Sequence, residues 1–192
     1  MKQQIMILIV TVFLLLASLS FVSISNAEDM VIASGNILYV GGSGPGNYSN
    51  IQDAVDDANP GDTVFVYSGT YDNGISIYVN KSINLIGENQ DTTVIDGNKS
   101  RCGIIITANG TTVSDFKIQN CSGSCYPYGC SGIFVYNSYY IVSDISIINC
   151  RLENNTNGIV FSSVSLSIRC LFLVEYHHVM FNINMHKNPL TP

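Results

Sequence analysis

One nine-residue segment occurs twice, and it constrains the fold more than any other feature of the chain. Val113 to Cys121 (VSDFKIQNC) returns as Val142 to Cys150 (VSDISIINC), with six of nine positions identical and an offset of 142 − 113 = 29. Gly103 and Gly132 precede those cysteines at equal distances in sequence. Such copies predict a solenoid, because each coil can bury its hydrophobic row only against the next coil. Equivalent positions in neighbouring coils should therefore stack.

The segments around these copies read as short strands. Apolar runs of three to six residues occupy 63–67, 75–79, 82–86, 93–95, 103–107, 113–118, 132–136, 144–148 and 158–161. Glycines punctuate them at Gly69, Gly74, Gly87, Gly97 and Gly110. Parallel strands joined through helices need connections of a dozen residues or more, and these gaps are too short. We therefore expect a parallel stack of β-coils over residues 63–162, from which the loop 122–131 protrudes.

Residues 28–62 are expected to form a strand, a glycine-rich loop and a capping helix. The loop is Gly41 to Gly46, and it lacks the Lys-Ser/Thr ending of a phosphate-binding loop. Ser49 and Gln52 form a capping box before apolar residues at i, i+3, i+4 and i+7, which predicts an amphipathic helix that ends at 59–62. Such a helix would cover the open end of the first coil.

Residues 1–27 resemble a secretory signal peptide, with Lys2, an apolar stretch from Ile5 to Val22 and cleavage expected after Ala27. The alternative is an uncleaved membrane anchor. Removing Lys2 leaves 7 basic and 14 acidic side chains, so the net charge moves from -6 to -7. That balance argues against nucleic acid and anionic membrane surfaces as partners, since both bind a basic face. We expect a secreted or cell-surface protein, with membrane contact only through that segment.

The stretches YSNIQDAVDDA (48–58), PGDTV (60–64), GTY (69–71) and INLIG (83–87) resemble the amino-terminal signature of right-handed parallel β-helix proteins. These include the pectin-lyase-like superfamily and, more closely, NosD-like and archaeal cell-surface proteins with β-helix repeats. The resemblance covers roughly residues 37–162. It implies an all-β, right-handed parallel β-helix with an amino-terminal capping helix, and it implies no particular chemistry, because enzymes and non-enzymes share the signature.

Residues 163–192 form an atypical tail. A third copy would place Val-Ser-Asp at 168–170 and Asn-Cys at 175–176, where the chain has Ile-Arg-Cys and Glu-Tyr. We hypothesise that the reading frame is lost near Ser163 and that the β-helix is truncated. The alternative is a genuine carboxy-terminal cap.

The candidate catalytic residues are Asp115 and Asp144, with Lys117 nearby. If they stack, the two carboxylates lie about 5 Å apart. Such a pair could bind Ca²⁺ or serve a retaining glycosidase, and a polysaccharide lyase of the superfamily would add a basic residue such as Lys117. The interpretation that we favour is that each Asp follows a Ser at a turn because its side chain bonds local backbone amides.

Asn120 with Asn149, and Cys121 with Cys150, are expected to form structural stacks along the solenoid. The cysteine pair would be a disulfide or a buried thiol ladder. Further candidate disulfides involve Cys102, Cys125 and Cys130, and Cys102 would approach Cys130. No paired CxxC spacing is present, so we predict no zinc site. A NosD-like copper role is poorly supported, because the coils contain no His and no Met lies between Met30 and Met180.

Two further residue sets bear on binding and modification. Tyrosines that could stack on sugars cluster around the insertion and the following coil at Tyr126, Tyr128, Tyr136, Tyr139 and Tyr140. Candidate N-glycosylation sequons begin at Asn47, Asn80, Asn98, Asn109, Asn120 and Asn154, although asparagine-rich turns also generate such triplets by chance.

These observations favour an exported structural or adhesive β-helix module that binds extracellular polysaccharide and needs no cofactor apart from a candidate Ca²⁺. The alternative is a polysaccharide lyase or glycoside hydrolase that uses stacked carboxylates. The sequence leaves the oligomeric state and the identity of the glycan open.

Overall fold

The computed structural model describes residues 35–72, 74–123, 130–162, 168–171 and 182–184. Their strands are β1 (Ile37–Val40), β2 (Thr63–Val66), β3 (Gly69–Tyr71), β4 (Ile77–Val79), β5 (Asn84–Gly87), β6 (Thr93–Asp96), β7 (Ile104–Ile106), β8 (Thr112–Ser114), β9 (Lys117–Gln119), β10 (Ser131–Tyr136), β11 (Ile145–Ile148), β12 (Arg151–Glu153), β13 (Asn157–Ser162), β14 (Ile168–Leu171) and β15 (Asn182–Asn184). The helix α2 (Ile51–Asp57) lies between β1 and β2 in sequence.

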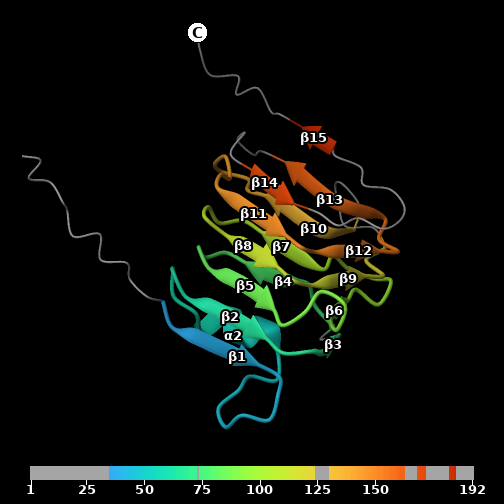
Figure 1. Ribbon diagram of the computed structural model, residues 1–192. Helices are drawn as coiled ribbons and strands as arrows, with labels where there is room; N and C mark the ends of the chain where they lie inside the picture. Colours follow the sequence, from blue (N-terminus) through green and yellow to red (C-terminus); the bar gives the residue numbers. More distant parts are fainter. Residues whose placement is uncertain (1–34, 73, 124–129, 163–167, 172–181, 185–192) are drawn as a thin grey trace, which may run out of the picture. The chain divides into compact units, whose positions relative to one another are not determined.

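The strands form three parallel sheets that the chain visits in turn (Figure 1). Sheet A has the order β1-β2-β5-β8-β11-β14, sheet B has β3-β6-β9-β12, and sheet C has β4-β7-β10-β13-β15. From β2 to β13, consecutive strands pass from A to B to C and then return to A one coil further on. This confirms the predicted parallel β-helix, which has about five coils. The strands β14 and β15 extend sheets A and C beyond residue 162, while the loss of the reading frame stays a hypothesis.

The core lies between the three sheets and is filled by alternate residues of each strand. In sheet A the inward row includes Val64, Leu85, Val113 and Ile147, all fully buried and in register. Phe116, at the corner between sheets A and B, is the largest fully buried side chain among the described residues. Because β-branched and aliphatic residues pack well on a pleated surface, this alternation both forms the strands and closes the core.

Helix α2 packs against β1, β2 and β4 at the amino-terminal end of the stack. Its N-cap is Asn50, whose side chain accepts a hydrogen bond from the Gln52 backbone N–H at 2.8 Å, so the predicted Ser49 cap is wrong by one position. At the other end, Lys81 Nζ donates to the Ala58 carbonyl at 2.8 Å. In the described part of the chain, no helix has the length and apolar character needed to cross a membrane.

The register between coils differs from the one predicted. In sheet C, Ile104 pairs with Ile133, an offset of 133 − 104 = 29. In sheet A, Val113 pairs with Ile147, an offset of 147 − 113 = 34. The chain therefore takes a longer path from β10 to β11 than from β7 to β8. The stacking expected from the repeated nine-residue segment is wrong on sheets A and B.

The corrected register gives each corner residue a different neighbour. Asn120 follows β9 and Asn154 follows its partner strand β12, so these two asparagines, and not Asn120 and Asn149, share a position. The Cys121 backbone N–H donates to Asn155 Oδ1 at 2.8 Å, and Asn155 Nδ2 donates to the Ile118 carbonyl at 2.9 Å. Asn155 therefore links the coil of β9 to the coil of β12. Cys121 and Cys150 are both buried, but they do not occupy equivalent positions.

Candidate functional site

The candidate catalytic carboxylates are separated by the length of a strand. Asp115 follows β8 and accepts a hydrogen bond from Asn149 Nδ2 at 2.6 Å, and Asn149 follows the last residue of the neighbouring strand β11. Asp144 lies just before the first residue of β11, and its carboxylate is 3.0 Å from Ser143 Oγ. Both aspartates have left-handed backbone, with φ of 63° and 56°. Asp and Asn tolerate this conformation better than most residues, so both positions are corners of the coil. The expected carboxylate pair is wrong, because the register places Asp115 beside an amide.

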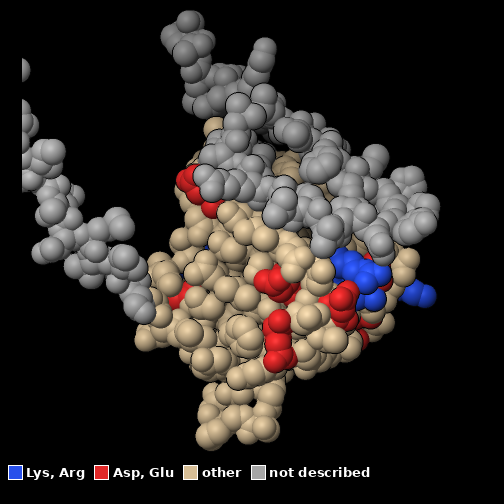
Figure 2. Space-filling model, viewed as in Figure 1, with Lys and Arg blue, Asp and Glu red and all other residues tan. Residues whose placement is uncertain are grey.

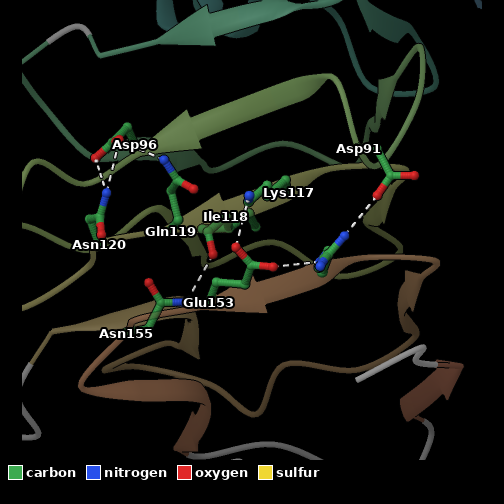
Figure 3. A network of polar contacts seen from close by, with 9 residues as sticks. Asp91, Asp96, Lys117, Ile118, Gln119, Asn120, Glu153 and Asn155 are labelled. Atoms are coloured by element: carbon green, nitrogen blue, oxygen red, sulfur yellow. Dashed lines mark hydrogen bonds and ion pairs between the residues drawn. The ribbon is translucent and has the colours of Figure 1, made fainter. Parts of the chain in front are cut away.

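Lys117 belongs instead to a charged network on the outer face of sheet B (Figure 3). Its Nζ lies 2.8 Å from Glu153 Oε2, and Arg151 contacts both Glu153 and Asp91, the latter at 3.0 Å. Lys117 and Arg151 are opposite each other on β9 and β12, and basic side chains gather over these strands in Figure 2. The hydrogen bond from Lys117 and the nearby cations outweigh partial burial and lower the pKa of Glu153. Glu153 is thus held as a carboxylate.

Asp96, on β6, is a second carboxylate that its neighbours fix in the charged form. Burial raises its pKa, but hydrogen bonds from Gln119, from the Asn98 backbone and from Asn120 prevail, so the net shift is downward. Gln119 Nε2 donates at 2.8 Å and Asn120 Nδ2 donates at 3.0 Å (Figure 3). Neither Asp96 nor Glu153 was predicted from the sequence. The available signal was the presence of charged or amide residues at alternate positions of β9 and β12, together with the Asp that ends β6.

A tyrosine surface, defined here as Tyr78, Tyr136, Tyr139 and Tyr140, lies on the outer side of sheet C and on the loop after β10, beside the buried Phe134. The rings of Phe134 and Tyr136 stack with centroids 4.6 Å apart and planes 13° apart. Burial raises the pKa of Tyr136, and the neighbouring Tyr78 side chain raises it further. Tyr140 donates to the Thr107 carbonyl at 3.0 Å, and Tyr139 is 95% exposed.

The structure therefore gathers three of the five predicted tyrosines and adds Tyr78, which was not predicted. Tyr78 lies far before Tyr136 in sequence and reaches it only because β4 and β10 flank β7. Gln52 of α2 holds the strand there, since its Oε1 accepts from the Tyr78 backbone N–H at 2.7 Å. Tyr126 and Tyr128 lie outside the described residues.

The cysteines are mostly buried thiols. Cys102, Cys121 and Cys150 are free, so the candidate disulfide at Cys102 is wrong in this structure, while Cys130 is not among the free thiols. Burial raises the pKa of Cys121 and of Cys150 to about 12. Of the two alternatives for Cys121 and Cys150, the structure has buried thiols, although not a ladder. Cys125 lies outside the described residues.

The sequons differ in how their asparagine side chains are engaged. Asn47 Nδ2 donates to the Gly41 carbonyl at 2.6 Å, and Asn120 Nδ2 donates to Asp96. Asn109 accepts from the Ser143 backbone at 3.0 Å. Asn80, Asn98 and Asn154 are exposed. Glycosylation at all six stays a prediction.

Within the described ranges, no group of three or more His, Cys, Asp or Glu residues is arranged to hold a metal ion. The three histidines, His177, His178 and His186, lie outside those ranges. The Ca²⁺ expected at Asp115 and Asp144 loses its geometric basis, because the two carboxylates do not meet.

Comparison with known proteins adds little beyond architecture. No protein family model and no curated protein matches the chain. A solved structure, the "Crystal structure of pectin methylesterase in complex with hexasaccharide VII", is similar at 16% sequence identity and a TM-score of 0.42. The match covers 66% of this chain and 54% of that one, so this chain spans about half the length of that structure. A likeness this distant assigns no ligand or activity here.

Proposed function

We propose that the chain is an exported structural or adhesive module that binds polysaccharide through the tyrosine surface of sheet C. The observation that carries this proposal is the set of tyrosines on sheet C and on the loop after β10, where Tyr78, Tyr139 and Tyr140 are 39%, 95% and 51% exposed. Tyrosine offers a sugar an apolar ring face and a hydroxyl group with few rotatable bonds to order. Stacking and hydrogen bonding can therefore be satisfied together.

The carboxylates support binding in preference to hydrolysis. A glycoside hydrolase needs a carboxylic acid with a raised pKa to protonate the leaving group. The pKa of Asp96 and that of Glu153 are both lowered. A lyase needs a basic side chain that can take a proton, and Lys117 is paired with Glu153 at 2.8 Å.

The alternative function keeps one specific observation in its favour. Lys117, Arg151 and Glu153 bring basic and acidic groups together on sheet B, and a substrate that displaced one ion pair would meet reactive side chains. If the chain is a polysaccharide lyase or hydrolase, this cluster is where its chemistry would take place.

The test offers the purified protein a panel of acidic and neutral polysaccharides, with and without Ca²⁺, and records both retention and newly formed chain ends. Tyr139→Ala should weaken retention about tenfold, as truncation of an aromatic anchor does. Ile141→Ala is the matched control, because Ile141 is 58% exposed on the same loop and carries no ring. New ends that disappear in Glu153→Gln would make the chain an enzyme. Export is checked separately by the amino-terminal sequence of the mature protein, expected to begin at Glu28.

A further inference from the structure

The outer face of sheet A carries two parallel rows of side chains with different chemistry. Because Val64 and Leu85 point into the core, the residues on either side of them point outward. The register aligns these outward residues across the strands. One row is aromatic and aliphatic, with Tyr39, Phe65 and Ile86 in register. The other is polar and uncharged, with Thr63, Asn84, Thr112 and Ser146 in register.

The apolar row begins in an aromatic cluster, defined as Tyr39, Phe65 and Tyr67. The rings of Tyr39 and Tyr67 stack with centroids 5.9 Å apart and planes 22° apart. Phe65 meets both edge-on, with centroids 6.0 Å from Tyr39 and 5.3 Å from Tyr67. Tyr39 is 40% exposed. The cluster therefore presents aromatic surface to solvent instead of burying it in the core.

The glycine-rich loop after β1 holds this cluster in place. Gly42 has a φ of +67°, and a Cβ built on it would lie 2.8 Å from Tyr67 Cδ2. Only glycine lets the backbone approach the ring this closely in that conformation. The Tyr71 hydroxyl also donates to the Tyr67 carbonyl at 2.8 Å. The loop, which has no role predicted from the sequence, thus positions an aromatic ring.

Charge decides what this face can bind. The strands β1, β2, β5, β8 and β11 contain no Asp, Glu, Lys or Arg. In Figure 2 the surface over β2, β5 and β8 is mostly uncharged, and acidic side chains appear only where these strands end. Glu88, which follows β5, accepts a hydrogen bond from the Ser68 backbone N–H at 2.8 Å. The whole chain carries a net charge of -6, which repels an acidic polymer and equally a second copy of the chain. An uncharged partner that offers apolar ring faces beside hydroxyl groups matches both rows.

We infer that the outer face of sheet A is a second glycan-binding surface, selective for neutral polysaccharide and centred on Tyr39, Phe65 and Tyr67. It is distinct from the tyrosine surface of sheet C and does not depend on it. The aromatic cluster takes the apolar faces of successive sugar rings, while Thr63, Asn84 and Thr112 bond their hydroxyl groups. The surface binds its ligand without chemical change.

The test is native affinity electrophoresis of the full chain in gels that contain β-1,4-glucan, mannan, arabinogalactan or polygalacturonate. At least one neutral polymer should retard the protein, and Tyr39→Ala should weaken that retardation about tenfold. Ile37→Ala, which removes a 53% exposed aliphatic side chain from the same strand, should leave it unchanged.

A pair of glycine variants tests the positioning of Tyr67 without removing a ring. Gly42→Ala should weaken retardation by the neutral polymer, because the new methyl group displaces Tyr67. Gly46→Ala has the same backbone cost, with a φ of +81°, but nothing lies within 4 Å of its Cβ, so retardation should persist. Thermal unfolding by circular dichroism confirms that each variant is folded at the temperature of the assay.

Three results would overturn the inference. One is retardation by no neutral polymer, another is retardation that Tyr39→Ala leaves intact, and the third is a dimer in wild-type protein that Tyr39→Ala dissociates. Tyr139→Ala separates this surface from the one on sheet C. Neutral-polymer binding that is lost in Tyr139→Ala and kept in Tyr39→Ala refutes the sheet A surface alone. Tyr139→Ala that leaves the binding of every acidic and neutral polymer intact refutes the sheet C surface alone.

Discussion

The hydrogen bond between Asp115 and Asn149 provides a direct test of how the coils are stacked. Asn149 Nδ2 donates to Asp115 Oδ1 at 2.6 Å, and both residues are half-buried. A hydrogen bond to a charged group contributes roughly 1.5–3 kcal/mol, and partial exposure places this one near the lower end. We therefore expect a coupling free energy of about 1.5 kcal/mol between the two side chains.

The measurement is a double-mutant cycle built from Asp115→Gly and Asn149→Gly, with the free energy of unfolding obtained from urea titrations. Glycine is the suitable replacement, because the φ angles of 63° and 51° would strain alanine and confuse the loss of the bond with a backbone cost. Each single variant should be less stable than the wild type. The double variant should lose less than the sum of the two.

The matched control is a cycle between Asp115→Gly and Asp144→Gly. In this structure the two side chains lie at opposite ends of neighbouring strands, so their coupling should be within about 0.5 kcal/mol of zero. In the register predicted from the repeated segment the two carboxylates would face each other, and the coupling would be repulsive. A coupling near zero for Asp115 with Asn149, or a repulsive one for Asp115 with Asp144, would refute the register of sheet A.

Three further predictions concern the core, the sheet B network and the thiols. Phe116→Ala should reduce the free energy of unfolding by about 3–5 kcal/mol in a urea titration, because the ring is fully buried. Glu153, whose pKa is lowered from 4.5, stabilises the fold above that pH and loses its contribution as the pH falls through the folded-state value. The stability difference between wild type and Glu153→Gln, measured near pH 7, should therefore shrink towards about pH 2. Cys121 and Cys150, with pKa values of about 12, should resist iodoacetamide at pH 8 until urea unfolds the protein, and mass spectrometry counts the alkylated thiols.

The parallel β-helix could be predicted from the sequence, whereas the register between its coils could not. The reason is that corner residues recur every five positions within each coil, so more than one offset aligns two coils. Left-handed corner residues occur five positions apart, at Asp115 and Asn120 and again at Asp144, Asn149 and Asn154. The two candidate offsets, 29 and 34, differ by one such step, so both superpose corner on corner. The sequence identity between the two nine-residue copies favoured the shorter offset. The conservative matches of Lys117 with Arg151 and of Ile118 with Leu152 supported the longer one.

The extra step lies in the loop between β10 and β11. Val142 is fully buried there although no strand contains it, so the loop adds a piece of core before sheet A resumes. In sequence this piece reads Val-Ser-Asp, the same as residues 113–115. Local similarity cannot distinguish an inserted corner from a repeated strand, because both need an apolar residue followed by one that tolerates left-handed backbone. The candidate carboxylate pair followed from that ambiguity.

The surfaces were hard to predict for a different reason, which is that each is assembled across coils. Tyr39 meets Phe65 through a spacing set by the helix α2, which is inserted between β1 and β2, and not by any repeat. Once the register is known, the outward residues sort by sheet. In sheet A the strands β1, β2, β5, β8 and β11 are uncharged, with aromatic residues at the amino-terminal end of the sheet. Sheet B carries ion pairs and amides, and sheet C carries tyrosines. The inward-pointing residues of all three sheets must be apolar, because they share one core. The outward-pointing residues are not constrained in this way, so a single solenoid can have chemically different surfaces that bind different partners.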